Sequence, residues 1–596
     1  MIRAVRVAVE SPLMQLDREF DFLVPESLQS ALEFGQRVSF RFGRSKTSQT
    51  GFVTQLLESS KFATSPIDGL VATHPVLTQQ ILTFARRVAD RQCVALGEIL
   101  SAAVPDHMPR IQVERPPTKM FKKPPSATRE VLLTGKQVAI RETYFPQWMP
   151  TFLTKAKVMF DEGFSSILLV PESSDANWLI QCANAMGIEV VNWEAGAKSE
   201  KFRKFNQVFE QVAIVIGTRS AIYVPVANLG LIAQADDADD SYQDVGSPHT
   251  NLRDLVLLRA DVSGASVLFA APYRSVELQR LVEIGYLSEL DAQVALPRIS
   301  YSSSSARVDD LSLKLAKEAL SKGTLLLLLP RKGTSTSAFC QGCGERIKCS
   351  CGGFVWEPTD QTFSCRICAR VVTSCAACKG TSFRRGRSGS ARTTAEVGKM
   401  FPGSVIFEAA GSKKPELRGK RNQILIATPG SAPRLAGGYS GLIVLDSDVW
   451  LSAQALRAEQ RALRDWCEAF ELLAPDARIH FSGLAEELGR PIALGQHREM
   501  AKQAFLEAKK LSLPPAVRFT KVTGSREQVS KAVSLLEQSG GEVVRNSGTE
   551  VLFRYPYKDG PRIAKELRAV ATAAKALRRG DKNIRGLSVV MDDGSL

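Results

Sequence analysis

Eight of the eleven cysteines of this chain lie within one short segment, between Cys340 and Cys378. They form three Cys-x-x-Cys pairs and one Cys-x-Cys pair, namely Cys340/Cys343, Cys365/Cys368, Cys375/Cys378 and Cys349/Cys351. A Cys-x-x-Cys turn places two thiolates on one side of a metal, and tetrahedral zinc needs four ligands. Eight cysteines therefore fill two Cys₄ zinc sites. Disulfides or an iron–sulfur cluster are the alternatives, and disulfides are disfavoured because nothing in the sequence marks the chain as secreted.

Length and charge narrow the class of protein. A chain of 596 residues is too long for one domain and indicates about three to five. Its net charge of +15 is typical of proteins that bind a polyanion, with nucleic acid as the first candidate. A solvated basic surface is the alternative. Apolar runs such as Leu325–Leu329 are too short to span a bilayer, and the first ten residues alternate like a strand. We therefore expect a cytoplasmic, nucleoid-associated protein without a membrane segment.

The first 112 residues are expected to form a small β-rich domain followed by helices. Val5, Val7 and Val9 are spaced as on one face of a half-buried strand, and the stretch 16–25 alternates in the same way before it stops at a proline. A linker rich in Pro and Lys follows over residues 113–127. This change in composition predicts the first domain boundary.

Two α/β blocks follow, over residues 128–300 and 301–512. Apolar runs of strand length alternate with helical periodicity in both blocks, which is typical of parallel sheets covered by helices. The expected strands are Ile167–Val170, Ile188–Val191, Val212–Ile216, Leu229–Ile232 and Val267–Ala270, then Leu325–Leu329, Ser404–Phe407, Gln423–Ile426, Leu442–Leu445 and Ile479–Phe481. The cysteine segment, residues 336–384, interrupts the second block after its first expected strand. The sequence therefore predicts an insertion and not a separate tail.

The last segment, residues 513–596, has the order β-α-β-β-α-β, which is typical of a ferredoxin-like domain. Its second helix is expected over residues 561–579. This helix carries five basic residues, Lys565, Arg568, Lys575, Arg578 and Arg579. A solvated helix face and a phosphate-contacting face are both compatible with them. The charge of the whole chain favours DNA binding through phosphate contacts.

Several motifs resemble the PriA family of primosomal replication-restart helicases. Residues 20–25, F-D-F-L-V-P, resemble the family's F-D-Y-L-x-P strand. Residues 215–221, V-I-G-T-R-S-A, are the most specific match, and residues 228–232, N-L-G-L-I, resemble the segment before the family's acidic nucleotide motif. With the eight cysteines, the resemblance spans nearly the whole chain. It implies a multidomain α/β protein with two RecA-like lobes and a double zinc ribbon inserted in the second lobe.

The resemblance also implies site residues. The family's N-terminal domain holds the 3′ end of a nascent DNA strand, and Phe20, Asp21 and Gly43 occupy the matching positions. An aromatic ring can stack on a base, a carboxylate can accept from a 3′-hydroxyl or a base edge, and glycine allows close backbone approach. A role in the core is the alternative for Phe20. The implied zinc sets are Cys340, Cys343, Cys375 and Cys378 for one ion, and Cys349, Cys351, Cys365 and Cys368 for the other.

The chain departs from this family at three elements of phosphoryl-transfer chemistry. No P-loop, G-x-x-x-x-G-K-[ST], occurs in the sequence, and the nearest fragment is Leu133–Gln137. The family's D-E-E-H motif falls on Ala235-Asp236-Asp237-Ala238, so the Mg²⁺-binding Asp and the His are both replaced by Ala. An amphipathic helix after Arg457 stands where an arginine finger is expected. The pattern resembles actinobacterial members with degenerate helicase motifs, for which we expect no catalysis.

These observations favour a replication-restart protein that assembles the primosome at stalled or branched forks without helicase activity of its own. Its expected cofactors are two Zn²⁺ ions, and ATP is not expected. Its expected partners are forked or single-stranded DNA, primosome proteins, the replicative helicase or its loader, and a single-strand-binding protein. Two alternatives stay open. One is an active ATP-dependent 3′–5′ DNA helicase with an atypical nucleotide site, and the other is a zinc-dependent scaffold that recruits proteins.

Overall fold

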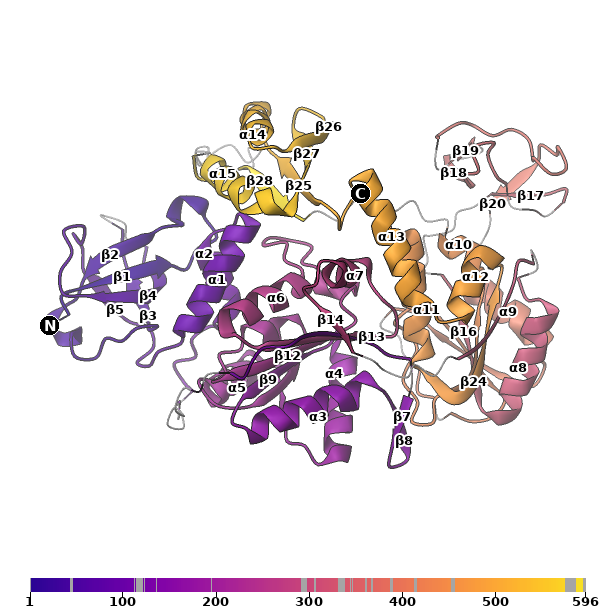
Figure 1. Ribbon diagram of the computed structural model, residues 1–596, viewed down its shortest axis with the longest axis horizontal. Coiled ribbons are helices and arrows are strands. Elements are labelled where there is room, and N and C mark those ends of the chain that lie inside the picture. Colours follow the sequence, from indigo (N-terminus) through magenta and orange to yellow (C-terminus); the bar gives the residue numbers. More distant parts are fainter. Residues whose placement is uncertain are drawn as a thin grey trace.

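A computed structural model of the chain contains four folded parts and a small cysteine-rich module (Figure 1). It describes residues 2–592 except 43–46, 112, 114–121, 123, 136, 195, 291–296, 305–306, 331–337, 344, 346, 360–361, 366–367, 386–389, 412–414, 418, 452–455 and 574–585. None of the described helices combines the length and the apolar composition that crossing a bilayer requires.

The N-terminal part is a five-stranded antiparallel sheet with the order β2-β1-β4-β3-β5, followed by two helices. The elements are β1 Ala4–Val9, β2 Glu19–Leu23, β3 Arg37–Phe40, β4 Gln49–Leu57, β5 Ile67–Leu70, α1 Gln79–Gln92 and α2 Leu96–Ala103. Val5, Val7 and Val9 are buried in the core of this sheet, as their alternation predicts. The β-rich fold expected for this segment is thus confirmed.

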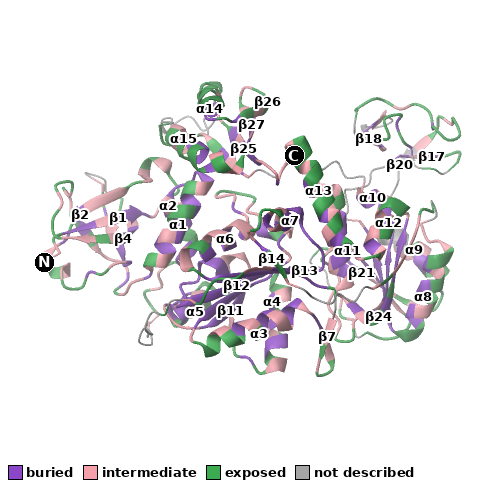
Figure 2. Ribbon diagram, in the orientation of Figure 1, coloured by how far each residue is buried: buried purple, intermediate pink, exposed green. Residues whose placement is uncertain are grey.

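The next part, lobe 1, is built on a seven-stranded parallel sheet with the order β10-β11-β9-β12-β13-β6-β14. Its strands are β6 Arg129–Leu133, β9 Ser165–Leu169, β10 Val191–Asn192, β11 Ile214–Gly217, β12 Leu229–Ala235, β13 Ser266–Ala271 and β14 Ser288–Leu290. Its helices are α3 Trp148–Asp161, α4 Ser173–Met186, α5 Lys198–Val208, α6 Leu252–Ser263 and α7 Val276–Glu283. Every residue of β12 is buried, because helices cover both faces of the sheet (Figure 2).

One expected strand of lobe 1 is much shorter than the sequence predicts. The run Ile188–Val191 contributes only its last residue to β10. The Ile188 amide donates to the Ala183 carbonyl, 2.9 Å away, and Gly187 ends α4 in the left-handed conformation. This hydrogen bond closes the end of the helix. The start of the apolar run therefore caps α4 and does not join the sheet.

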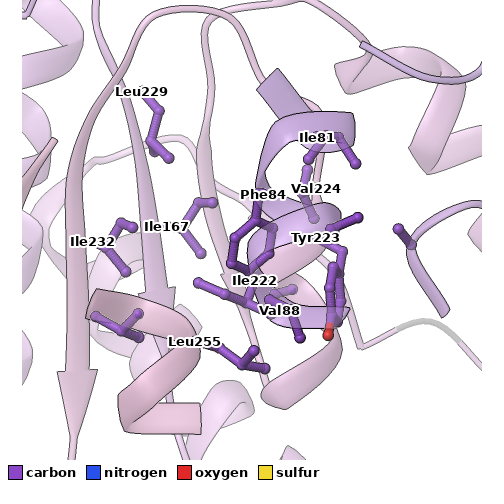
Figure 3. Packing of buried hydrophobic residues seen from close by; sticks show 14 of the residues in the cluster. Ile81, Phe84, Val88, Ile167, Ile222, Tyr223, Val224, Leu229, Ile232 and Leu255 are labelled. Atoms are coloured by element: carbon purple, nitrogen blue, oxygen red, sulfur yellow. The ribbon is translucent and has the colours of Figure 1, made fainter. Parts of the chain in front are cut away.

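Helix α1 packs directly against lobe 1. Its residues Ile81 and Phe84 face Ile222 and Tyr223, which lie in the short 3-10 helix Arg219–Tyr223 (Figure 3). The Phe84 and Tyr223 ring centroids are 5.5 Å apart. These residues belong to one buried cluster that continues into the lobe 1 sheet. The N-terminal part is therefore held against lobe 1 by a shared core.

Lobe 2 contains a six-stranded parallel sheet with the order β15-β24-β23-β16-β22-β21. Its strands are β15 Arg298–Ser302, β16 Thr324–Leu328, β21 Val405–Ala409, β22 Gln423–Ala427, β23 Tyr439–Val444 and β24 Leu473–Ser482. Its helices are α8 Asp310–Lys322, α9 Ser390–Met400, α10 Ser447–Leu451, α11 Ala458–Phe470, α12 Glu486–Ala493 and α13 His497–Leu511. Strand β15 was not predicted, because this edge strand is partly exposed and has no apolar run. It crosses the expected boundary at residue 300, so the cysteine segment follows the second strand of lobe 2 and not the first.

The C-terminal part has the predicted element order and a four-stranded antiparallel sheet, β26-β27-β25-β28. Its elements are β25 Arg518–Thr523, α14 Arg526–Gln538, β26 Glu542–Asn546, β27 Glu550–Tyr555, α15 Gly560–Ala573 and β28 Ser588–Met591. This topology confirms the ferredoxin-like fold. The predicted second helix extends to residue 579, and its portion beyond Ala573 lies outside the described residues.

Three parts of the molecule meet at Arg91, in the last turn of α1. Its Nη2 lies 2.9 Å from an Asp254 carboxylate oxygen of α6 and 3.1 Å from one of Asp592, which follows β28. Asp592 also pairs with Arg518 of β25, at 2.5 Å. These partly buried ion pairs connect the N-terminal part, lobe 1 and the C-terminal part. A pair that is removed from solvent loses less to screening than a surface pair, so this junction fixes the three parts together.

Candidate functional site

The eight cysteines of the inserted segment form two groups of four sulfur atoms. The first group is Cys340, Cys343, Cys375 and Cys378, and the second is Cys349, Cys351, Cys365 and Cys368. Within each group the sulfurs lie within 4.8 Å of one another, with 3.4 Å between Cys340 and Cys378. Sulfurs about 2.3 Å from one tetrahedral zinc are roughly 3.8 Å apart, whereas disulfide sulfurs are about 2.05 Å apart. Each group therefore fits one tetrahedral metal ion, and the structure records all eight thiols as free.

The Cys-x-Cys pair reaches its metal site through a tight turn. The Gly352 amide donates to the Cys349 carbonyl, 2.9 Å away, and Gly352 has a φ of +84°, which glycine adopts without a Cβ clash. The amide of Cys351 lowers the pKa of the Cys349 thiol to about 6. In the first group, the amide of Cys343 lowers the pKa of the Cys340 thiol to about 7. These two shifts favour the thiolate, which is the form that binds a metal. The amides of Glu345 and Gly353 act in the same direction on Cys343 and Cys351, but the neighbouring sulfurs outweigh them and raise the pKa of these two thiols to about 12 and about 11.

The cysteine-rich module that carries these groups contains two short antiparallel ribbons. Strand β17 Ala338–Cys340 pairs with β20 Phe383–Arg385, and β18 Val355–Thr359 pairs with β19 Thr362–Cys365. One cysteine of each ribbon is therefore fixed at a strand end. In Figure 1 the ribbons lie apart from the sheet of lobe 2. This placement leaves the module accessible to other molecules.

A cavity of about 590 Å³ opens beside β2 in the N-terminal part. Phe20 and Asp21, two of the residues that the family resemblance assigns to the 3′ end, line it together with Arg18, Phe42 and Phe62. Its volume lies within the range of roughly 300–1,000 Å³ that is typical of small-ligand pockets. The Phe20 ring is half-buried and packs on Phe42, with 4.9 Å between the ring centroids. Phe20 therefore belongs both to the edge of the core and to the cavity. Gly43 lies outside the described residues.

The Asp21 carboxylate is held in place by two neighbouring side chains. Arg6 of β1 donates to both of its oxygens, at 2.9 and 3.2 Å, and the Ser60 hydroxyl donates to Oδ2 at 2.6 Å. The Arg6 hydrogen bond lowers the pKa of Asp21, so the group is an ionised acceptor at neutral pH. A carboxylate offers about four acceptor positions. Three are taken and the Asp21 side chain is 5% exposed, so at most one position is left for a hydroxyl or N–H group of a ligand.

The basic residues expected on the last helix differ in their surroundings. Lys565 is exposed on α15. Arg568 pairs with Asp17 of the N-terminal part and with Asp90, at 3.1 Å, so its guanidinium joins two parts of the molecule. The expected phosphate-contacting face thus has one exposed cation among its described members. Lys575, Arg578 and Arg579 lie outside the described residues.

The loop after β6 differs from a phosphate-binding loop. It leads into a hairpin, β7 Gln137–Ile140 and β8 Thr143–Pro146, before α3 begins. The Tyr144 amide donates to the Ala436 carbonyl of lobe 2 at 3.0 Å. Glu471, also of lobe 2, accepts from Trp148 Nε1 at 3.2 Å. The segment in which the resemblance would place a P-loop therefore contacts lobe 2 directly.

The acidic motif at the end of β12 is occupied by an arginine from lobe 2. Arg464 of α11 binds Asp236 through Nε at 2.9 Å and through Nη2 at 2.8 Å, and it also pairs with Asp239. The Tyr273 hydroxyl donates to the other Asp236 oxygen at 3.0 Å. Burial alone would lower the pKa of Arg464, but Asp236 and its acidic neighbours raise it well above the usual value. The guanidinium is therefore charged and bridges the two lobes.

Little space is left between these groups. The cavity between Trp148, Asp175, Asp236, Arg434 and Glu471 measures about 20 Å³. This is room for about one water molecule and far too little for a nucleotide. Arg434 of lobe 2 pairs with Asp175 of lobe 1 at 3.1 Å and closes the same contact. Among the described residues, the place where a nucleotide would meet both lobes is filled by protein side chains.

A larger groove of about 1290 Å³ runs between the lobes beside this closed contact. Loops that follow parallel strands of both sheets line it, and its lining includes Thr218, Arg219, Gly411, Gly430 and Arg434. Ligands of open α/β sheets bind at this edge, beyond the carboxyl ends of the strands. Three cations line the groove, Arg219, Arg434 and Arg464, and each of them is paired with a carboxylate. Six carboxylates line the same groove, so its surface is acidic overall.

Two residues of the candidate sites were not predicted from the sequence. One is Phe62, which lies in a stretch without a recognisable motif. The other is Arg464, which was treated only as part of an amphipathic helix. Its position gave a usable signal, because Arg464 lies beside Leu463, Trp466 and Cys467 within the apolar face of that helix. A charged residue in an apolar face requires a buried partner of opposite charge.

Comparisons with known proteins agree with these features. The family described as the PriA "3'DNA-binding domain (3'BD)" matches residues 6–105. The chain is 30% identical over 507 residues to the "Probable replication restart protein PriA" of Mycobacterium bovis, covering 77% of each chain. It is 28% identical over 570 residues to the Mycobacterium leprae protein of the same name, covering 87% of each, and 24% identical over 500 residues to the "Replication restart protein PriA" of Rickettsia felis, covering 74% of each.

Solved structures give weaker likenesses. A DEAD box protein from Methanococcus jannaschii has a TM-score of 0.28 at 11% identity, covering 64% of this chain and 86% of that chain. The DUF1998 helicase MrfA bound to DNA has a TM-score of 0.32 at 11% identity, covering 71% of this chain and 54% of that chain. Likenesses of this size carry no argument about function.

Proposed function

Since the chain belongs to the PriA family of replication restart proteins, we propose that it binds branched DNA at a nascent 3′ end and does so without hydrolysing ATP. The observation that carries this proposal is the cavity beside β2. Phe20 and Asp21 line it, and both lie within the segment, residues 6–105, that matches the 3′ DNA-binding domain. The cavity combines aromatic surface, cations and one open carboxylate acceptor position. These are the groups that a terminal nucleoside with a free hydroxyl requires.

The two lobes act in this proposal as a rigid support for the N-terminal part, which shares a buried core with lobe 1. Arg464 and Arg434 close the neighbouring nucleotide position, so nucleotide turnover does not drive the lobes apart. Without a P-loop, a Mg²⁺-binding Asp and an arginine finger, the chain lacks the groups that stabilise a transferring phosphoryl group.

The two cysteine groups are proposed to bind zinc. Their thiolate ligands and tetrahedral spacing suit Zn²⁺, and sites of four cysteines without an open position are structural. The zinc would hold together a module that has few other buried residues. Because this module lies apart from the lobes (Figure 1), we propose that it recruits primosome proteins, such as the replicative helicase, its loader or a single-strand-binding protein.

Fluorescence anisotropy of the whole protein on two labelled forks tests the proposed function. The forks differ only in whether a nascent strand ends with a 3′-hydroxyl at the junction. We expect tighter binding to the 3′-ended fork and a steep loss of affinity with salt, because counterions are released from the phosphates. Asp21→Asn should reduce the preference about tenfold, since a charge-assisted hydrogen bond is lost. Glu26→Gln, at an exposed carboxylate outside the cavity, is the matched control. Equal affinity of the unaltered protein for both forks would contradict the proposal.

The recruiting role of the zinc module has a separate test. Deleting residues 336–384 should abolish pull-down of partner proteins and leave the preference for the 3′-ended fork unchanged. If fork binding is lost while pull-down persists, the module is a DNA-binding element and the recruiting role is wrong.

A further inference from the structure

One aromatic ring at the 3′-end cavity is exposed to an unusual degree. Phe62 has 69% of its surface exposed, more than any other phenylalanine among the large exposed hydrophobic residues of the described chain. It lines the same cavity as Phe20 and Asp21. Single exposed apolar residues are common on protein surfaces and need no function. An exposed ring at the mouth of a ligand-sized cavity is a different case, because a ligand in the cavity would cover it.

The other aromatic ring at this site is less available for stacking. Arg18 lies over the Phe20 ring, with its guanidinium carbon 4.7 Å from the ring centroid. Phe42 packs against Phe20 edge-on, and both rings rest on the buried core of the sheet. Phe62 is outside that core, and the Lys61 ammonium lies 5.2 Å from the centroid of its ring. The larger accessible aromatic surface at the cavity thus belongs to Phe62.

The loop that carries Phe62 is tied to the carboxylate of the same cavity. The Phe62 amide donates to the Ser60 hydroxyl oxygen at 3.1 Å, and the Ser60 hydroxyl donates to Asp21 Oδ2 at 2.6 Å. Beyond Phe62, the Leu23 amide of β2 donates to the Ser65 carbonyl at 2.9 Å. Both ends of the loop are therefore anchored beside β2. This arrangement holds the backbone of Phe62 beside the Asp21 carboxylate before a ligand binds, which lowers the entropic cost of ordering the loop.

From these contacts we infer that Phe62 is the stacking residue for the terminal base, while Asp21 accepts from the sugar hydroxyl of the same nucleoside. The inference rests on the proposed function and adds a specificity residue to it. Every nucleobase has a π-face, so stacking on Phe62 tolerates any terminal base. Recognition would then depend on the presence of a 3′ terminus and not on its sequence.

The test uses the whole protein and the fork pair described above, with 2-aminopurine as the 3′-terminal base. Stacking on an aromatic ring quenches the fluorescence of this base. We expect quenching by the unaltered protein and by Phe62→Trp, and none by Phe62→Ala. Phe62→Ala should also weaken binding to the 3′-ended fork about tenfold. Its binding to the fork without a 3′-hydroxyl at the junction should be unchanged. Leu13→Ala is the control, because Leu13 is 53% exposed in the same part of the protein and lies outside the cavity.

The other outcomes show whether the inference fails alone or together with the proposed function. If Asp21→Asn lowers the fork preference and Phe62→Ala does not, the 3′-end function stands and the role of Phe62 is wrong. If Phe62→Ala weakens both forks equally, Phe62 is a general DNA contact and the inference is also overturned. If the unaltered protein binds both forks equally, the inference fails together with the proposed function.

Discussion

Arg464 of lobe 2 lies with its Nε 2.9 Å from Oδ2 of Asp236 of lobe 1. Asp236 belongs to the segment that replaces the family's acidic, Mg²⁺-binding motif. A protein cation therefore neutralises the remaining carboxylates of this motif, and the cation is supplied by the opposite lobe. In a helicase of this architecture a nucleotide and its metal would lie between the lobes. Here the side chains that fill the space also hold the lobes together.

Removal of this cation should loosen the interlobe contact. Arg464→Ala would leave Asp236 and Asp239 as partly buried carboxylates without their main partner, a change that typically costs about 3–5 kcal/mol. We expect the first unfolding transition in urea to move to a clearly lower midpoint. The midpoint is the suitable measure, because a multidomain chain does not unfold in two states.

Arg461→Ala provides the matched control for this experiment. Arg461 lies one turn earlier on the same helix and is exposed, so its loss should change the stability by about 0.5 kcal/mol or less. Equal midpoints for the two variants would show that the Arg464 contact does not hold the lobes together.

The stability of the interlobe contact should fall between pH 5 and 7. Burial raises the pKa of Glu471 to about 7, although Arg434 opposes the rise. An unfolded Glu has a pKa of about 4.3, so between these values the folded protein holds a proton that the unfolded chain has released. The contribution of Glu471 to stability is then largest below about pH 4.3 and decreases as the pH rises to about 7, by up to about 1.4 kcal/mol per pH unit. Glu471→Gln should flatten this slope in urea midpoints measured at several pH values. Parallel slopes for both proteins would contradict the assignment.

Metal analysis should find about two zinc ions per chain. Cys340→Ser removes one ligand of the first group and should reduce the content to about one, because a three-cysteine site binds Zn²⁺ more weakly. Cys182→Ala, which changes a buried cysteine of lobe 1, should leave two ions in place. A content near zero in purified, reduced protein would argue against both sites.

Lys565 and Arg568 should respond differently to replacement, although they are three residues apart on α15. Lys565→Ala removes an exposed cation, and we expect the slope of log K against log salt to decrease by about 0.9 in fork binding. Arg568→Ala removes a partner of the buried Asp17 carboxylate, so it should lower the unfolding midpoint and leave the slope unchanged. A slope that changes only with Arg568 would reverse this assignment.

The sequence predicted the fold well where one type of residue determines the structure. Cysteine pairs, alternating valines in β1 and apolar runs such as Leu325–Leu328 of β16 each follow from local chemistry. Strand β15 was missed because its stability comes from pairing with β24, which is almost two hundred residues away. The run Ile188–Val191 was predicted as a strand, but its first residue is not in the sheet because the Ile188 amide donates to a carbonyl at the end of α4.

The candidate site was predicted in the same partial way. Phe20 and Asp21 follow from a motif, but Arg6 and Ser60 become visible only when the sheet brings β1 and the loop after β4 beside β2. Arg464 shows the limit most clearly. The missing nucleotide motifs could be read from the sequence, whereas the cation that fills their place comes from a residue more than two hundred positions away in another lobe.

The measurement that tests this account most directly is ATP hydrolysis by the zinc-loaded protein, with and without a fork that carries a nascent 3′ end. Fork binding is recorded in the same sample, so that inactive protein is recognised. The account predicts tight fork binding with turnover at the background level in both conditions. Hydrolysis that increases on adding the fork would contradict it, because the lobes would then open to a nucleotide at the contact that Arg464 and Glu471 close.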